Sequence, residues 1–360
     1  MRVLFVADTH LGLDLPARPR VVRRRRGDDF FQNFERALDA ARSGDVDVVV
    51  HGGDLLYRSR VPAWLVEAAL APLKRLASSG VPVLLVPGNH ERGQLPYPLL
   101  ALHDGLHIFD RPRTIVLEAH GVRVAFIGFP YTPDIRRRFP EMFAAATREG
   151  HPAPPALAAN GRELRRGLAV AARREPGAAE AADVRVLCIH QCIEGATCGP
   201  ANFTFRFAPD VIRTADLPRD LAVTLSGHIH RHQVLRPPHR SPVIYAGSVE
   251  RTSFAEAPER KGYVVLDLAP SGLRAFEFRE LPTRPMLRRT ISLGDARPSE
   301  AHACVAEALE STPQDAVVQL RVTGVIPPAL TAATLRLLAG ARNVTLAPLS
   351  RPFRSGHRIG

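Results

Sequence analysis

The chain has 360 residues, of which 45% are hydrophobic, enough for one sizeable domain and a smaller one. Its apolar runs are far shorter than the roughly 18 residues that span a bilayer, and its first ten residues lack the apolar region of a signal peptide. Four cysteines do not make a disulfide framework, so the sequence predicts a cytoplasmic protein with no membrane partner.

The charge balance is strongly basic. The formal net charge is +12 and the pI is about 10.6, which favours an anionic partner such as nucleic acid. Lysine occurs only at Lys74 and Lys261, so nearly every positive charge is an arginine. A genome-wide bias toward Ala, Pro and Arg explains the same composition, and both interpretations stay open.

The first 280 residues alternate apolar runs with helical patterns, which predicts a layered α/β domain. Helices are expected at Asp28–Arg42, where apolar residues share one face, and at Pro62–Ala77, which Pro72 should kink or break. Strands are expected at Arg2–Ala7, Val46–Val50, Val81–Val86, Thr114–Ala119, Val122–Phe126, Val184–Ile189, Leu221–Leu225, Pro242–Ala246 and Gly262–Leu268. The fourth and fifth of these strands flank a His-Gly turn and should form a hairpin.

Two segments differ in character from this domain. Residues 149–182 are rich in Ala, Pro, Gly and Arg and predict an insertion with one helix near Glu163–Arg173. A second set of elements predicts a small α/β module at 281–350, and a basic tail follows at 351–360. The elements of the module are expected at Met286–Leu293, Ala316–Val325 and Asn343–Leu349 as strands and at Ser299–Glu310 and Pro328–Leu338 as helices.

Polar clusters follow five of the apolar runs. Because ligands bind beyond the carboxyl ends of the strands in open α/β sheets, the five clusters are expected to converge on one site. The clusters hold Asp8 and His10, His51 to Asp54, Gly88 to His90, His190, and Gly227 to His230.

Seven side chains in these clusters are candidate metal ligands. Asp and neutral His coordinate borderline divalent ions, and the Asn carbonyl oxygen also coordinates. Seven donors exceed one tetrahedral site and suit two ions that share a bridging carboxylate. At a strand end, residues i and i+2 point to the same side. The two side chains of the D-x-H pair, and those of the H-x-H pair, are therefore expected to face the same ion site. The seven candidates are Asp8, His10, Asp54, Asn89, His190, His228 and His230.

The ordered motifs resemble the signature of the calcineurin-like metallophosphoesterases. The resemblance is carried by D8-x-H10, G53-D54, G88-N89-H90-E91, H190 and G227-H228-x-H230. Within that superfamily the chain resembles the SbcD-type DNA double-strand-break repair nucleases, through ADTHLG near the N-terminus and YAGSVERTSFAE at Tyr245–Glu256. The resemblance implies a layered β-sandwich flanked by helices over 1–280 and a small α/β capping domain at 281–350.

The resemblance also implies a role for each motif residue. It assigns one ion to Asp8, His10 and His230, the other ion to Asn89, His190 and His228, and the bridging position to Asp54. His90 is then the general acid or the stabiliser of the transition state, not a ligand. The His-rich set argues against Mg²⁺. Mn²⁺ is the usual ion of the family, and Fe²⁺ or Zn²⁺ also fit.

An arginine run follows the first motif. Arg18–Arg26 holds six arginines in nine residues. It is either a loop that contacts DNA phosphates beside the site or a solvated charge run. The residues singled out for DNA binding are Arg23, Arg24, Arg25 and Arg26.

Other residues near the motifs also allow two interpretations. Phe203, Phe205 and Phe207 alternate as in an ordinary half-buried strand, which is favoured over base stacking. His51 either supports the ligands or is a hydrogen-bonded histidine of the core or the surface. Tyr57 stands where archaeal and eukaryotic relatives carry a histidine, which leaves the balance between exonuclease and endonuclease activity open.

Three functions are compatible with this pattern. The leading hypothesis is a Mn-dependent DNA exonuclease and endonuclease of DNA repair. The second is a phosphodiesterase or phosphatase acting on small nucleotides or phosphoesters, since the same metal core serves both. The third is a DNA-binding scaffold without catalysis, against which the complete ligand set and His90 argue.

DNA is the partner expected for the leading hypothesis. The apolar side chains of Trp64–Leu76 either support a homodimer or pack on the sheet. The resemblance also implies an SbcC-type SMC-like ATPase, which relatives grip with a helical segment beyond the capping domain. Because this chain stops at Gly360 after a short tail, it is expected to be either truncated or paired with a different partner.

Overall fold

The computed structural model describes residues 1–15, 24–148, 182–293, 297–323, 328, 330–340 and 342–346. The chain forms two units, one of Met1–Ala17 with Arg26–Pro282 and one of Arg18–Arg25 with Thr283–Gly360. Several predictions fall outside the described residues: the insertion apart from residue 182, its helix, Arg23 and the basic tail.

The first unit is built on two six-stranded sheets. In the first sheet, the order is β16-β15-β1-β2-β3-β4. Its first four strands in the chain run parallel, and the hairpin β15–β16 adds antiparallel to β1. The strands are β1 (Arg2–Val6), β2 (Val48–His51), β3 (Val83–Leu85), β4 (Leu106–Ile108), β15 (Gly262–Ala269) and β16 (Gly272–Glu280).

The second sheet has the order β13-β14-β12-β7-β6-β5. Its four central strands are parallel, and β5 and β6 form the antiparallel hairpin predicted from the sequence, which is confirmed. The strands are β5 (Arg113–Ala119), β6 (Val122–Gly128), β7 (Val184–Ile189), β12 (Val223–Ser226), β13 (Gln233–Leu235) and β14 (Val243–Tyr245). Two short pairs lie outside it, β8 (Cys192–Ile193) with β11 (Val211–Ile212) and β9 (Thr197–Cys198) with β10 (Phe203–Thr204).

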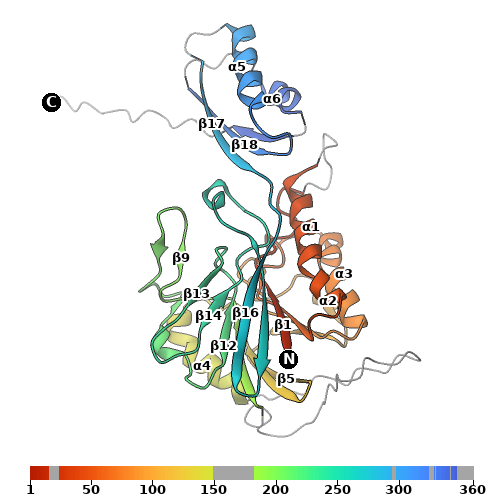
Figure 1. Ribbon diagram of the computed structural model, residues 1–360, viewed down its shortest axis with the longest axis vertical. Coiled ribbons are helices and arrows are strands. Elements are labelled where there is room, and N and C mark those ends of the chain that lie inside the picture. Colours follow the sequence, from red (N-terminus) through yellow and green to blue (C-terminus); the bar gives the residue numbers. More distant parts are fainter. Residues whose placement is uncertain are drawn as a thin grey trace, which may run out of the picture. The chain divides into compact units, whose positions relative to one another are not determined.

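The central strands of each sheet are buried on both faces. In β1, Val3 and Phe5 pack in the core that also holds Phe126 of the second sheet, whereas Leu4 and Val6 pack against the helices. Helices α1 (Arg26–Ala37), α2 (Asp39–Arg42) and α3 (Ala63–Ser78) cover the first sheet, and α4 (Ile135–Arg148) covers the second (Figure 1). Strands buried on both faces read as continuous apolar runs, as these do. The predicted layered β-sandwich flanked by helices is confirmed.

The helices correct three expectations. The helix predicted at 28–42 is two helices that meet at Leu38, and α3 runs unbroken through Pro72, so the predicted break is wrong. Pro72 is buried in α3, where core packing outweighs the lost hydrogen bond. Helix α4 was not predicted, although Ile135, Phe139 and Met142 form its buried stripe. Among the described residues, no helix combines the length and apolar character that a membrane crossing requires.

The second unit is a small parallel sheet with two helices. Its order of strand, helix, strand, helix, strand is the one expected from the sequence. Its strands pair in the order β17-β18-β19, and its core includes Ile291, Val305 and Leu320. The elements are β17 (Met286–Ser292), α5 (Pro298–Glu310), β18 (Val317–Thr323), α6 (Ala332–Leu338) and β19 (Asn343–Leu346).

Candidate metal centre

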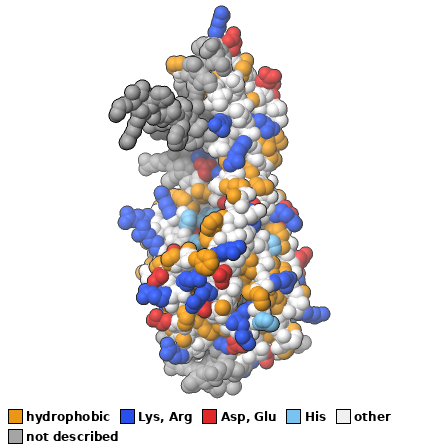
Figure 2. All heavy atoms as spheres, turned by 90° about the vertical axis from the view of Figure 1, so that its left-hand side faces the viewer, with side chains coloured by type: hydrophobic (Ala, Val, Ile, Leu, Met, Phe, Trp, Pro, Cys, Tyr) orange, Lys and Arg blue, Asp and Glu red, His pale blue; other side chains and the backbone are white. Residues whose placement is uncertain are grey.

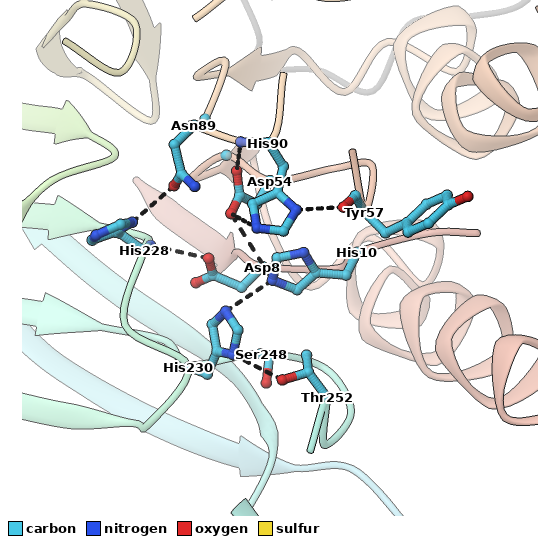
Figure 3. A network of polar contacts seen from close by, with 12 residues as sticks. Asp8, His10, Asp54, Tyr57, Asn89, His90, His228, His230, Ser248 and Thr252 are labelled. Carbon is cyan, nitrogen blue, oxygen red and sulfur yellow. Dashed lines mark hydrogen bonds and ion pairs between the residues drawn. The ribbon is translucent and has the colours of Figure 1, made fainter. Parts of the chain in front are cut away.

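All seven predicted donor side chains lie together in the first unit. They come from loops after the carboxyl ends of strands in both sheets, as the sequence predicted. Figure 3 shows Asn89 and His228 on one side, His10 and His230 on the other, and the carboxylates between them. The loops follow β1 (Asp8, His10), β2 (Asp54), β3 (Asn89), β7 (His190) and β12 (His228, His230).

One group of donors consists of Asp8, His10 and His230, each offering one atom within 4.8 Å of the others. The Nε2 atoms of His10 and His230 face each other at 2.9 Å. His230 donates from Nδ1 to the Glu256 carboxylate at 3.0 Å, which leaves a lone pair on its Nε2.

A second group consists of Asn89, His190 and His228. The Asn89 Oδ1 atom lies 3.0 Å from His190 Nε2 and 2.8 Å from His228 Nδ1. His190 donates from Nδ1 to the carbonyl of Gly52 at 2.7 Å, so its Nε2 is the nitrogen that faces the site. These three residues are the ones that the family resemblance assigned to the second ion, and the division of the donors between two ions stays a prediction.

Asp54 lies between the two groups. Its Oδ2 atom is 3.4 Å from His190 Nε2 and 4.0 Å from His10 Nε2. Its Oδ1 atom accepts the backbone N–H of His90 at 2.9 Å. Asp54 therefore reaches both ligand sets, and so does Asp8, which groups with His10 and His230 and also with His190.

The charges of the site are strongly coupled. Burial disfavours the charged form of His190, but the Asp54 carboxylate outweighs it and raises the pKa of His190 to about 9. Burial likewise disfavours the charge of Asp54, yet His190 leads the interactions that hold the pKa of Asp54 well below its usual range. Burial raises the pKa of Asp8, and burial and then His190 lower the pKa of His228 to about 3.

The donor set fits divalent cations. Among the described residues, Asp8 Oδ2 is a buried oxygen with no hydrogen-bond partner, and an oxygen in that position normally has one. One proton between the facing nitrogens of His10 and His230 satisfies both, and its loss would leave two lone pairs for a cation. Imidazole nitrogens with carboxylate and amide oxygens are ligands for Mn²⁺, Fe²⁺ or Zn²⁺.

The backbone brings the donors together in a way that the sequence argument did not foresee. Asp8, His10, Asp54 and His228 have φ angles of 52°, 43°, 52° and 84°. They therefore lie in left-handed turns beyond the strands, and the alternation of i and i+2 on a strand is the wrong reason for their convergence. Asp and His enter this region more readily than most residues, at a local cost in energy.

Two motif glycines allow close approach instead of a sharp turn. A Cβ atom on Gly88 would lie 2.2 Å from Asp54 Oδ1, and one on Gly227 would lie 2.3 Å from the Gly52 carbonyl oxygen. No side chain fits at either position. The glycines thus permit the loops of both sheets to meet at the site.

His90 lies at the open edge of the centre. Its Nδ1 donates to the backbone carbonyl of Tyr57, and its Nε2 lies 3.8 Å from Asp54 Oδ2. Its side chain is 37% exposed, whereas that of Asp54 is 2% exposed, so His90 is open to solvent. The Tyr57 side chain lies beneath the Arg58 guanidinium, so the residue holds His90 through its backbone.

Two buried residues that hold the loops, Glu91 and Glu256, received no role from the sequence, and the role of His51 was left open. Glu91 accepts the backbone N–H groups of Gly88, Asp54 and Leu56 at 2.8, 3.1 and 2.7 Å. Its place beside His90 in the motif was the only signal. Glu256 ends the run Tyr245–Glu256, which served only to show the resemblance to the nuclease family.

His51 supports the ligand loops without facing the ions. It contacts the Thr9 hydroxyl at 3.1 Å and accepts the N–H of Gly53 at 3.2 Å. Burial and then His190 lower the pKa of His51 to about 3, so the ring is neutral. Of the two interpretations, the supporting role agrees with these contacts.

The described arginines of the basic run have separate surroundings. Arg24 and Arg25 belong to the second unit, and the Arg24 carbonyl accepts the side chain of Asn343 at 3.1 Å. Arg26 begins α1, and its guanidinium donates to the Arg251 carbonyl. Burial lowers the pKa of Arg26. Phosphate binding by this run remains a prediction.

The aromatic triplet is not the half-buried strand expected from its alternation. Phe203 and Phe207 are 62% and 80% exposed, and Phe205 alone packs against the core. The β9–β10 turn is held by Arg231, which donates to the Gly199 carbonyl at 2.6 Å and to the side chain of Asn202 at 2.7 Å. The expectation fails because only Phe203–Thr204 pair as a strand.

Comparison with known proteins assigns the first unit to a family. The model of the family described as "Calcineurin-like phosphoesterase" matches residues 1–232. The DNA double-strand break repair protein Mre11 of Methanopyrus kandleri is 27% identical over 78% of this chain and 57% of its own length. The protein of the same name from Methanosarcina mazei is 30% identical over 90% of this chain and 45% of its own length. The chain thus spans about half the length of these curated relatives.

A solved structure to which the chain is similar is a dimetal phosphatase from Danio rerio. It is 12% identical, with a TM-score of 0.42, and the match covers 74% of this chain and 91% of that chain.

Removal of metal should destabilise the first unit. Ions bound only by the folded state at a hundredfold excess over Kd add about 2.7 kcal/mol to the free energy of unfolding. We expect a chelator to lower the melting temperature by several degrees, and added Mn²⁺ to restore it. In Asp54→Asn, which alters the carboxylate common to both ligand sets, the chelator should have little effect. An equal shift in both proteins would contradict this assignment.

Proposed function

The chain belongs to the calcineurin-like phosphoesterase family, and from this premise we propose that it is a metal-dependent phosphodiesterase that cuts DNA in double-strand break repair. The observation that carries the proposal is the Asp54 carboxylate between two groups of donors. The relatives named as repair proteins support DNA as the substrate.

We assign the two ligand sets to two ions. Asp8, His10 and His230 hold one ion, Asn89, His190 and His228 hold the other, and Asp54 serves both. Two such ions, when bound, activate water and neutralise the charge that develops on the phosphate. Mn²⁺ is the ion proposed, since a set with four imidazoles is a poor match for Mg²⁺.

His90 is proposed to act on the leaving oxygen. Its ring is held at Nδ1 by the Tyr57 carbonyl, so Nε2 is the nitrogen that is free to give a proton. It is also the most exposed of the site imidazoles beside Asp54, where substrate would arrive. His10 and His190, the other imidazoles within 4.0 Å of Asp54 Oδ2, are buried.

A polymeric substrate is supported by charge and surface. The chain carries a net charge of +12, and basic side chains are spread over the face in Figure 2, with hydrophobic side chains among them. The exposed rings of Phe203 and Phe207 flank Arg206, which is also exposed. Aromatic rings beside a cation bind unpaired bases and their phosphates.

Partners of the chain are further proposals. Most apolar side chains of α3 are buried against the sheet, and Trp64 is 45% exposed. A homodimer through this helix therefore depends on few side chains. An SbcC-type SMC-like ATPase remains a proposal from the family resemblance.

The assay compares three substrates. Purified protein with Mn²⁺ is incubated with end-labelled duplex DNA, with single-stranded DNA and with bis-p-nitrophenyl phosphate, and Asp54→Asn serves as the control for contaminating nucleases. We expect DNA to be degraded by the wild type alone. Cleavage of the small ester without DNA would favour a phosphodiesterase of small substrates, and binding without cleavage would favour a scaffold.

His90→Ala should lose turnover and keep its metal. General acid catalysis contributes about 10²–10⁴-fold, so kcat on DNA should fall by that factor while metal content stays at the wild-type value. Bis-p-nitrophenyl phosphate has a good leaving group, so its hydrolysis should fall much less. Equal losses on both substrates would reject a role for His90 in protonating the leaving oxygen.

The aromatic hairpin gives a prediction on DNA binding. Base stacking on an aromatic ring is worth about 1–3 kcal/mol per base, so Phe203→Ala and Phe207→Ala should each raise the Kd for single-stranded DNA about 5- to 150-fold. Hydrolysis of bis-p-nitrophenyl phosphate should not change. Leu102→Ala, which removes another exposed apolar side chain, is the matched control, and weakening of the same size there would refute stacking.

A further inference from the structure

A buried ion-pair cluster lies directly behind one of the metal-facing histidines. Lys261 is 1% exposed, and its ammonium lies 2.8 Å from Glu256 Oε2 and 2.9 Å from Glu259 Oε2. The same ammonium donates to the backbone carbonyl of His230 at 2.8 Å. The cluster is therefore bonded to His230 through its backbone and, by way of Glu256, through its ring.

The Glu256 carboxylate has a separate partner for each oxygen. Oε1 accepts from His230 Nδ1 and from the Thr252 hydroxyl, whereas Oε2 accepts from Lys261 and from the Thr252 backbone N–H. Burial opposes the charge of Glu256, but the His230 hydrogen bond and Lys261 lower its pKa below the usual range. The carboxylate is thus ionised and fixed in orientation behind the imidazole.

Isolated ammonium groups are costly to bury, by several kcal/mol. The chain has lysine at only two positions and uses arginine almost everywhere else. Lysine at 261 presents a compact charge to two carboxylates and one carbonyl, a geometry that a planar guanidinium does not match. Core packing alone therefore does not explain why a charged side chain is buried at this position.

The two ligand sets are backed by groups of different charge. His230 donates from Nδ1 to a carboxylate, whereas His190 donates from Nδ1 to the neutral carbonyl of Gly52. A carboxylate partner fixes the tautomer of a ligating histidine and raises its basicity, and loss of such a partner typically lowers metal affinity about 10- to 100-fold.

We propose that Glu256, held by Lys261, is a positioning residue for the ion of Asp8, His10 and His230. Loss of the hydrogen-bond partner behind a ligand should therefore weaken the binding of this ion more than the binding of the other ion. Lys261 also keeps the carboxylate behind the ring by engaging the oxygen that does not face His230. The proposal rests on the two-ion site of the proposed function.

The test measures metal binding and needs no substrate. Titration of metal-free protein with Mn²⁺ by calorimetry, with metal content measured after dialysis, resolves two binding events in the wild type if the two-ion site is correct. In Glu256→Gln one event should weaken by about 10- to 100-fold and the other should not change. Fewer than two events in the wild type would refute the two-ion premise itself.

Glu259→Gln is the matched control. Glu259 pairs with the same ammonium but does not touch His230, since its other partner is Arg231. This variant should keep both affinities. Equal weakening in the two glutamine variants would show that the buried charge acts only on the fold and would overturn the proposal.

A second variant keeps the proposal testable if Glu256→Gln does not fold. Thr252→Val removes the hydroxyl that contacts both the Glu256 carboxylate and His230 Nδ1, without unpairing a buried charge. It should weaken the same ion by a smaller factor. Wild-type affinity for both ions in every variant that alters the contact with His230 would reject the positioning role.

Discussion

The burial of the central strands of both sheets on both faces is the constraint from which the site follows. One apolar core joins the inner faces of the two sheets and leaves them about 10 Å apart. The strands β1, β2 and β3 are parallel in one sheet, and β7 and β12 are parallel in the other. Loops at their carboxyl ends therefore emerge where donors from both sheets reach the same point.

Bringing these donors together opposes the stability of the fold. Left-handed backbone at a residue other than glycine costs on the order of 1–3 kcal/mol, and Asp8, His10, Asp54 and His228 all adopt it. At Asp54 a hydrogen-bond network offsets part of this cost, because Glu91 accepts the backbone N–H groups of Asp54, Leu56 and Gly88. The site is held by hydrogen bonds to its loops as much as by the sheets.

Much of this arrangement was predictable from the sequence. The strands that lead to the motifs are continuous apolar runs, and polar residues follow each of them, so the convergence of the seven donors followed from the position of strand ends. The reason for the pairing of Asp8 with His10 was wrong, because alternation along a strand does not describe residues in turns.

Other parts depend on tertiary contacts that periodicity does not encode. Nothing local connects Glu256 with His230, which lies 26 positions away, until β14 and the following turn bring them together. The alternation of Phe203, Phe205 and Phe207 resembled a half-buried strand. The sequence pattern is the same whether or not other residues cover one side of the chain. Helix α4 was missed because its arginine run hid a regular apolar stripe.

Strand β7 separates His190 from the point where the described chain resumes after α4. The chain leaves the described structure after Arg148, at the end of α4, and returns just before β7, whose first residue is Val184. His190 follows the opposite end of that strand, and six residues of strand extend about 20 Å. A change in chain length before Val184 therefore does not by itself shift His190 along the strand.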